Sequence, residues 1–284
     1  MKYFGWVLIT TIAAWTAWPL ATTGQSPSES PHAVRISPLI ERLEQGGVVG
    51  PDVWQMIDME HGLYLINELR ARLNEFGEQR KPNGQLQVTP GVRIPPYGEE
   101  NPSWIVKQVL DIGALAIVFP QIDTKEEALR AVRSMRIPPQ RGTKYPDPPG
   151  IRGAGLWSTD GFTGFPLWGK MDADEYMRRA DLWPLNPGGE LFAYIMIESS
   201  EGVRNINDIL DVPGIGGILI GVNDLSINLG VGRATRAGQP LAPEAQTAVR
   251  TVLNACLAKK VLCSIIGGGD RNELIKLGFF RVPR

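Results

Sequence analysis

Short apolar runs alternate with amphipathic stretches along most of this chain, and the alternation predicts a series of strands and helices. The runs at 115–119 and 191–197 are apolar throughout, as expected of strands that are buried on both faces. In another stretch, Leu65, Leu69 and Leu73 recur at helical spacing. The pattern therefore predicts repeated strand–helix units.

The predicted elements follow one another from residue 53 to the end of the chain. Thr124 and Glu127 form the Thr-x-x-Glu pattern of a capping box, which predicts that a helix begins at Lys125. Residues 137–170 are rich in proline and glycine and form the longest irregular stretch. The predicted strands are 53–57, 91–94, 115–119, 191–197, 218–220, 261–266 and 279–282, and the predicted helices are 65–76, 103–110, 125–135, 173–182, 203–210, 242–259 and 270–277.

This order of elements predicts an α/β fold with a parallel sheet, specifically a (β/α)8 TIM-type barrel over residues 37–284. Such a barrel takes about 250 residues, so one domain uses nearly the whole chain. Residues 47–50 are a candidate first strand, but the next strand begins at Val53, which leaves no room for a crossover. The chain also ends directly after the last predicted strand, so we predict a barrel that lacks its first and last helices.

The N-terminal 24 residues have the composition of an export signal. Met1 and Lys2 precede an apolar run that extends to Ala21, and small and polar residues follow. We predict export, with a membrane anchor as the alternative, although the run falls short of about 20 apolar residues. Residues 25–36, which include His32, are predicted to be a disordered lead-in.

Composition limits the chemistry that the chain can perform. Lys and Arg number 29 against 30 Asp and Glu, and this balance argues against nucleic acid as a partner. The two cysteines, Cys256 and Cys263, do not form a disulfide framework. Because His32 and His61 are the only histidines, a metal would be held mainly by oxygen, which favours Mg²⁺ or Mn²⁺, with Co²⁺ as an alternative.

Ionisable residues stand where the predicted strands end, and the carboxyl ends of parallel strands share one face of a barrel. Glu198 and Asp224 come from neighbouring strands and are candidate ligands of a divalent cation that would polarise a 2-oxo acid. Arg93 would stabilise the enolate oxygen, and His61, oriented by Asp58, would move a proton at the substrate hydroxyl. Glu60 lies in the same turn, and we favour a structural ion pair for it over a water-mediated metal contact.

A set of motifs in this order resembles the HpcH/HpaI aldolase/citrate lyase family of phosphoenolpyruvate/pyruvate-type TIM barrels. The motifs span about residues 53–230, and each is weak by itself. They are Ile57-Asp58-Met59-Glu60-His61-Gly62, Val92-Arg93-Ile94-Pro95, Val109-Leu110-Asp111-Ile112-Gly113-Ala114, Phe119-Pro120, Ile151-Arg152-Gly153, Ile197-Glu198-Ser199-Ser200-Glu201-Gly202 and Ile220-Gly221-Val222-Asn223-Asp224-Leu225-Ser226.

The resemblance implies a class II, metal-dependent aldolase that cleaves a 4-hydroxy-2-oxo acid to pyruvate and an aldehyde through a metal-bound enolate. It assigns the metal to Glu198 and Asp224, proton transfer to His61 with Asp58, and the enolate oxygen to Arg93. It also implies that backbone amides near Asn223 and Asp224 hold the substrate carboxylate.

The resemblance further places Gly153 at the mouth of the site. For Arg152, a brace of the loop and a substrate contact both stay open as interpretations. The chain departs from the family at Val222, where proline is usual, and at Met196, where glutamine is common.

Two other functions remain as alternatives. One is a lyase of the citrate lyase β type that acts on a CoA thioester, which export disfavours because CoA is intracellular. The other is a non-catalytic barrel that binds an organic acid. The family resemblance also implies a homo-oligomer, but the absence of a closing helix leaves the oligomeric state open.

Overall fold

The computed structural model describes residues 34–283 apart from 97–102, 154–165, 170 and 235–239. The chain divides into two units, 1–33 and 34–284, and only the second is described below. The predicted export signal, most of the lead-in and His32 therefore lie outside the described residues. Among the helices that are described, none combines the length and the apolarity that a transmembrane span requires.

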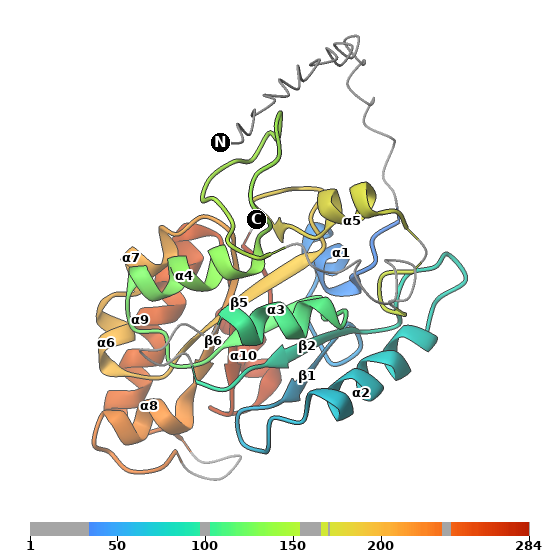
Figure 1. The fold of residues 1–284 in the computed structure, drawn as a ribbon. Helices are drawn as coiled ribbons and strands as arrows, with labels where there is room; N and C mark the ends of the chain where they lie inside the picture. The colour runs from blue at the N-terminus through green and yellow to red at the C-terminus, as the bar shows by residue number, and fades with distance from the viewer. Residues whose placement is uncertain (1–33, 97–102, 154–165, 170, 235–239, 284) are drawn as a thin grey trace, which may run out of the picture. The chain divides into compact units, whose positions relative to one another are not determined.

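The described residues form a parallel α/β fold (Figure 1). The strands are β1 (Trp54–Asp58), β2 (Thr89–Arg93), β3 (Ala116–Phe119), β4 (Leu182–Trp183), β5 (Leu191–Ile197), β6 (Ile215–Gly221) and β7 (Leu262–Ile266). The helices are α1 (Pro38–Glu44), α2 (Ile66–Glu78), α3 (Ser103–Asp111), α4 (Lys125–Met135), α5 (Ala173–Arg179), α6 (Ser200–Arg204), α7 (Ile206–Leu210), α8 (Val222–Asn228), α9 (Pro243–Lys259) and α10 (Arg271–Leu277).

The sheet is curved and open rather than a complete barrel. Its strand order within the described chain is β1-β2-β3-β5-β6-β7, with the short β4 paired to β5, and every pairing is parallel. The predicted parallel α/β class is confirmed, whereas an eight-stranded barrel is not formed by these residues. The observed arrangement is a half-barrel whose first and last expected strands are absent.

The predicted strand at 279–282 is wrong because Phe280 has a φ of 63°, which lies outside the range that strands allow. Phe280 still connects β7 to the segment that precedes β1. Its N–H donates to the carbonyl of Cys263 in β7 at 2.7 Å, and its own carbonyl accepts from Val49 at 2.7 Å. The candidate strand at 47–50 is wrong as well, since its backbone hydrogen bonds form no ladder with a described strand.

Two apolar cores lie on the two sides of the sheet. The outer core separates the sheet from the helices, and α3 and α4 lie side by side across it in Figure 1. The inner core fills the concave side with alternate residues of the strands, among them Val118, Tyr194 and Leu262. Leu39, Ile40 and Leu43 of α1 belong to this inner core, so α1 closes the end of the half-barrel where the strands begin.

The fold begins within the segment that was predicted to be a lead-in. Ile36 is buried, and its carbonyl accepts a hydrogen bond from the Leu86 amide at 3.2 Å. Arg35 pairs with Glu44 and donates to the Gly189 carbonyl at 3.0 Å. Residues 35 and 36 are therefore held by contacts with distant parts of the chain.

The capping box predicted at the start of α4 is confirmed. The Thr124 hydroxyl accepts from the Glu127 amide at 3.3 Å, and the Glu127 carboxylate accepts from the Thr124 amide at 3.0 Å. We expect Thr124→Ala to lower the free energy of unfolding by about 1 kcal/mol, because one amide of the first helical turn loses its partner.

Chemical denaturation at a fixed pH measures this effect. Thr247→Ala is the matched control, since this exposed hydroxyl of α9 bonds only to a carbonyl within its own helix. The expected change for the control is within about 0.5 kcal/mol. Equal losses in the two variants would contradict the capping role.

Candidate functional site

Inward-facing residues at the carboxyl ends of the strands form the candidate site. Asp58 ends β1 and is paired in register with Arg93, which ends β2. Glu198 follows β5, and Asp224 lies in the first turn of α8 directly after β6. Because the strands are parallel, their carboxyl ends lie together, and these four residues lie at one end of the sheet, as predicted.

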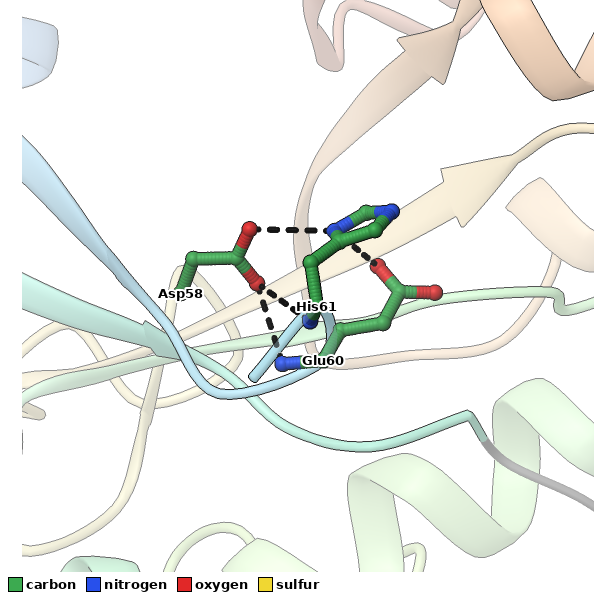
Figure 2. A group of neighbouring side chains, drawn as sticks. All are labelled: Asp58, Glu60 and His61. Carbon is green, nitrogen blue, oxygen red and sulfur yellow. Dashed lines mark hydrogen bonds and ion pairs between the residues drawn. The ribbon is translucent and has the colours of Figure 1, made fainter. Parts of the chain in front are cut away.

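The turn after β1 brings Asp58, Glu60 and His61 together (Figure 2). The Asp58 carboxylate accepts hydrogen bonds from the amides of Glu60 at 3.0 Å and His61 at 3.4 Å, which fixes the turn. Its second oxygen lies 3.0 Å from Nδ1 of His61. The His61 ring is 62% exposed, so its other nitrogen can reach a ligand or solvent.

Arg93 is buried beneath this turn and joins its acidic residues. Its Nε donates to Asp58 at 3.1 Å, its Nη2 also contacts Asp58, and its Nη1 lies 3.0 Å from the Glu60 carboxylate. Nη2 lies 2.7 Å from Nδ1 of His61 as well. A guanidinium only donates and a carboxylate only accepts, so the tautomer of His61 decides whether Nδ1 bonds to Asp58 or to Arg93.

Asp58 stays ionised at every physiological pH. Partial burial opposes its ionisation, but hydrogen bonds from Arg93, the Glu60 amide and His61 lower the pKa of Asp58 to about 2. A permanent carboxylate beside Nδ1 favours the tautomer in which His61 donates to Asp58. In that tautomer the exposed ring nitrogen carries a free lone pair and can act as a base.

Glu198 is the most perturbed acid of the site. The whole residue is 4% exposed, and its carboxylate accepts a hydrogen bond from the Gln121 amide at 3.2 Å. Burial, together with the nearby carboxyl groups of Glu60 and Asp224, raises the pKa of Glu198 to about 8 against the effect of that bond. The carboxyl group of Asp224 is close enough to that of Glu198 to raise its pKa, so the structure brings these two residues together.

Gly221 leaves space for the Glu198 carboxyl group beside β6. A Cβ atom at Gly221 would lie 2.6 Å from Oε2 of Glu198 and 2.7 Å from the terminal methyl of Met196. Glycine therefore lets the Glu198 carboxylate lie directly against β6.

The donor set fits a hard divalent cation. Glu60, Glu198 and Asp224 repel one another electrostatically, and a bound cation would relieve that repulsion. Oε2 of Glu60 is buried and accepts no well-aligned hydrogen bond from the described residues. Ligand atoms of Asp58, Glu60 and His61 also lie within 4.8 Å of one another, so this side of the site offers a second group of possible ligands.

Glu60 is the residue whose involvement was underestimated. Its ion pair with Arg93 agrees with the structural interpretation, but its effect on the pKa of Glu198 connects it to the carboxylates on the other side of the site. The position of Glu60 between Asp58 and His61 in the sequence is the feature that indicates a place in the site.

The predicted substrate-binding residues are less closely connected. Asn223 precedes Asp224 in α8, and its side chain accepts from Arg233 at 3.3 Å. Gly153 is exposed, and a side chain there would meet only Lys107 of α3 among the described residues. Arg152 is buried, where it donates to Asp111 at 3.2 Å and contacts Tyr176, as a brace does.

Comparison of sequences finds one family that covers most of the chain. The model of the HpcH/HpaI aldolase/citrate lyase family matches residues 41–273. A 4-hydroxy-2-oxo-heptane-1,7-dioate aldolase of Shigella flexneri is 30% identical over 184 residues, which are 62% of this chain and 59% of that protein. A hydroxypyruvate/pyruvate aldolase of Chromohalobacter salexigens is 30% identical over 217 residues, or 76% and 70% of the two chains.

Solved structures give the same similarity. An HpcH/HpaI aldolase/citrate lyase family protein of Burkholderia cenocepacia superposes with a TM-score of 0.63 at 25% identity, covering 86% of this chain and 81% of that one. The citrate synthase SbnG shares the fold at 20% identity, with a TM-score of 0.63 and coverage of 87% and 89%.

The raised pKa of Glu198 predicts how stability depends on pH when divalent cations are removed with a chelator. The folded protein keeps the Glu198 proton up to about pH 8, whereas an ordinary glutamate releases it near 4.5. The folded state therefore binds more protons than the unfolded state between these values, so its stability falls as the pH rises from 5 to 8.

Glu198→Gln cannot ionise, so we expect its free energy of unfolding to fall less over this interval. Denaturant titrations at several pH values measure the difference. Glu75→Gln, at an exposed position of α2, is the control and should follow the wild type. Parallel pH profiles for wild type and Glu198→Gln would refute the assignment.

Proposed function

The chain belongs to the HpcH/HpaI aldolase/citrate lyase family, and from this membership we propose that it is a divalent-metal-dependent carbon–carbon lyase. The proposed reaction cleaves a 4-hydroxy-2-oxo acid to pyruvate and an aldehyde. The observation that supports it best is the convergence of Glu198 and Asp224 on the face that also carries Asp58, His61 and Arg93. Two of the relatives named above are named as aldolases, one of 4-hydroxy-2-oxo-heptane-1,7-dioate and one of hydroxypyruvate and pyruvate.

Glu198 and Asp224 are the proposed ligands of the cation, with Mg²⁺ or Mn²⁺ as the favoured ion and Co²⁺ as an alternative. A cation bound there would act as a Lewis acid toward the carbonyl oxygen of the 2-oxo acid. Backbone amides at Asn223 and Asp224 lie on the same side and are proposed to bind the substrate carboxylate. The 2-oxo acid end of the substrate then lies over Glu198 and Asp224.

His61 is the proposed base. The exposed nitrogen of its ring takes the proton of the 4-hydroxyl group, and the ionised Asp58 stabilises the imidazolium that results. The electrons of the C3–C4 bond move into the C2–C3 bond as the aldehyde departs, and negative charge collects on the C2 oxygen. A proton then returns to C3 and gives pyruvate.

Arg93 is proposed to stabilise that developing negative charge. Its guanidinium is buried and is held by Asp58 and Glu60, so its orientation is set before the reaction begins. Fixed charges of this kind stabilise a transition state without reorganisation at the moment of reaction. Export of the chain, its oligomeric state and a role for Gly153 at the mouth stay predictions.

Pyruvate release tests the proposed function directly. The chelator-treated protein is incubated with a panel of 4-hydroxy-2-oxo acids, with and without Mg²⁺, Mn²⁺ or Co²⁺, and pyruvate is measured by a coupled reduction. We expect release only when a divalent cation is added. Activity confined to CoA thioesters would assign the citrate lyase type instead, and binding of an organic acid without turnover would support the non-catalytic alternative.

Replacement of His61 separates proton transfer from metal binding. We expect His61→Asn to lower kcat by roughly 10²- to 10⁴-fold, because the base is lost, and to leave Mn²⁺ affinity within about threefold of wild type. Steady-state kinetics and Mn²⁺ titration measure the two quantities. His32→Asn is the control, and equal activity in the two variants would remove His61 from the reaction.

A further inference from the structure

One inward-facing position at the carboxyl ends of the strands is occupied by an apolar residue. On β7, Leu262 belongs to the inner core and the Ser264 hydroxyl lies 3.4 Å from that of Tyr194, which is also an inner-core residue. Cys263 and Ile265 belong to the outer core. Side chains alternate along a strand, so Ile266 faces inward, above Ser264.

Ile266 is not packed like the rest of its strand. Its exposure is 41%, whereas Leu262 and Ile265 are 0% and 6% exposed. Its apolar surface is therefore presented at the open face of the half-barrel, where the functional groups described above are polar or charged.

Gly221 puts Ile266 next to the carboxylates. Gly221 of β6 is paired in register with Ile266 of β7, and paired residues of parallel strands project to the same side of the sheet. A Cβ atom at Gly221 would lie 2.6 Å from Glu198. Because Gly221 has no side chain, no side chain of β6 at this level separates Ile266 from the Glu198 carboxylate.

We propose that Ile266 is a specificity-determining residue that contacts the hydrocarbon part of the 2-oxo acid component. This inference rests on the proposed function, which puts the 2-oxo acid end of the substrate over Glu198 and Asp224. The group that meets Ile266 is then C3, which is the methyl carbon of pyruvate. A hydroxyl group on C3, as in hydroxypyruvate, would lose its hydrogen bonds with water against this side chain.

The expected discrimination is moderate. An apolar contact rejects an added hydroxyl group by at most about 100-fold. Ile266 is only partly buried, so we expect about a tenfold preference for pyruvate that depends on this residue.

Aldol addition to one fixed short aldehyde measures this preference. The kcat/KM values for pyruvate and hydroxypyruvate are compared in wild type, Ile266→Thr, Ile266→Val and Leu277→Thr. Ile266→Thr supplies a hydroxyl group at the same branched Cβ, and we expect its ratio to move about tenfold toward hydroxypyruvate. Ile266→Val keeps an apolar surface and should keep the wild-type ratio.

Leu277→Thr is the matched control. Leu277 is 62% exposed at the end of α10, so loss of an exposed apolar side chain there should leave the ratio unchanged. Mn²⁺ affinity of Ile266→Thr should equal that of wild type, which distinguishes a substrate contact from displacement of Glu198.

An unchanged ratio in Ile266→Thr, or an equal loss of kcat/KM with both acids, would overturn the inference while wild-type activity upholds the proposed function. Failure of the wild type to use either acid would instead contradict the proposed function. In that event, titration of pyruvate and hydroxypyruvate followed by NMR decides the matter: preferential pyruvate binding that Ile266→Thr abolishes supports the contact, and identical binding by the two proteins rejects it.

Discussion

Electrostatic repulsion among the carboxylates of Glu60, Glu198 and Asp224 is the constraint on which the site depends. Burial of Glu198 and Glu60 disfavours their charged forms, and the neighbouring carboxyl groups disfavour them further, so the pKa of each carboxyl is raised. Arg93 compensates only the side that carries Asp58 and Glu60. The side formed by Glu198 and Asp224 has no such cation among the described residues, and this asymmetry is why a divalent ion is the natural complement.

The fold gives these groups a common position through strand direction and alternation. The same alternation that sends Ile195 and Ile197 to the outer core sends Met196 to the inner core and Glu198 to its open end. A one-residue shift of register would point Glu198 toward the helices instead. The many apolar residues of both cores therefore stabilise the orientation of a few charged ones.

Much of this could be predicted from the pattern of residues, because long periodic segments specify their own structure. The bounds of α4 and β5 agree with the prediction, and the four charged residues lie where their strands end. Short or unusual segments could not be predicted in this way. Helix α1 has seven residues, too few to show a period, and is specified by the Ser37 cap and by its packing. The backbone of Phe280 is determined by tertiary contacts with β7 and Val49, which a short segment with three apolar residues does not reveal.

Helix α1 closes the end of the half-barrel where the strands begin, and the functional groups lie at the opposite, open end. His61 lies at its rim and Glu198 at its base, as their exposures of 62% for the ring and 4% for the whole residue show. Under the proposed function, the aldehyde forms nearer the rim than pyruvate does. This geometry favours an ordered reaction in which the aldehyde departs before pyruvate and, in synthesis, pyruvate enters before its acceptor.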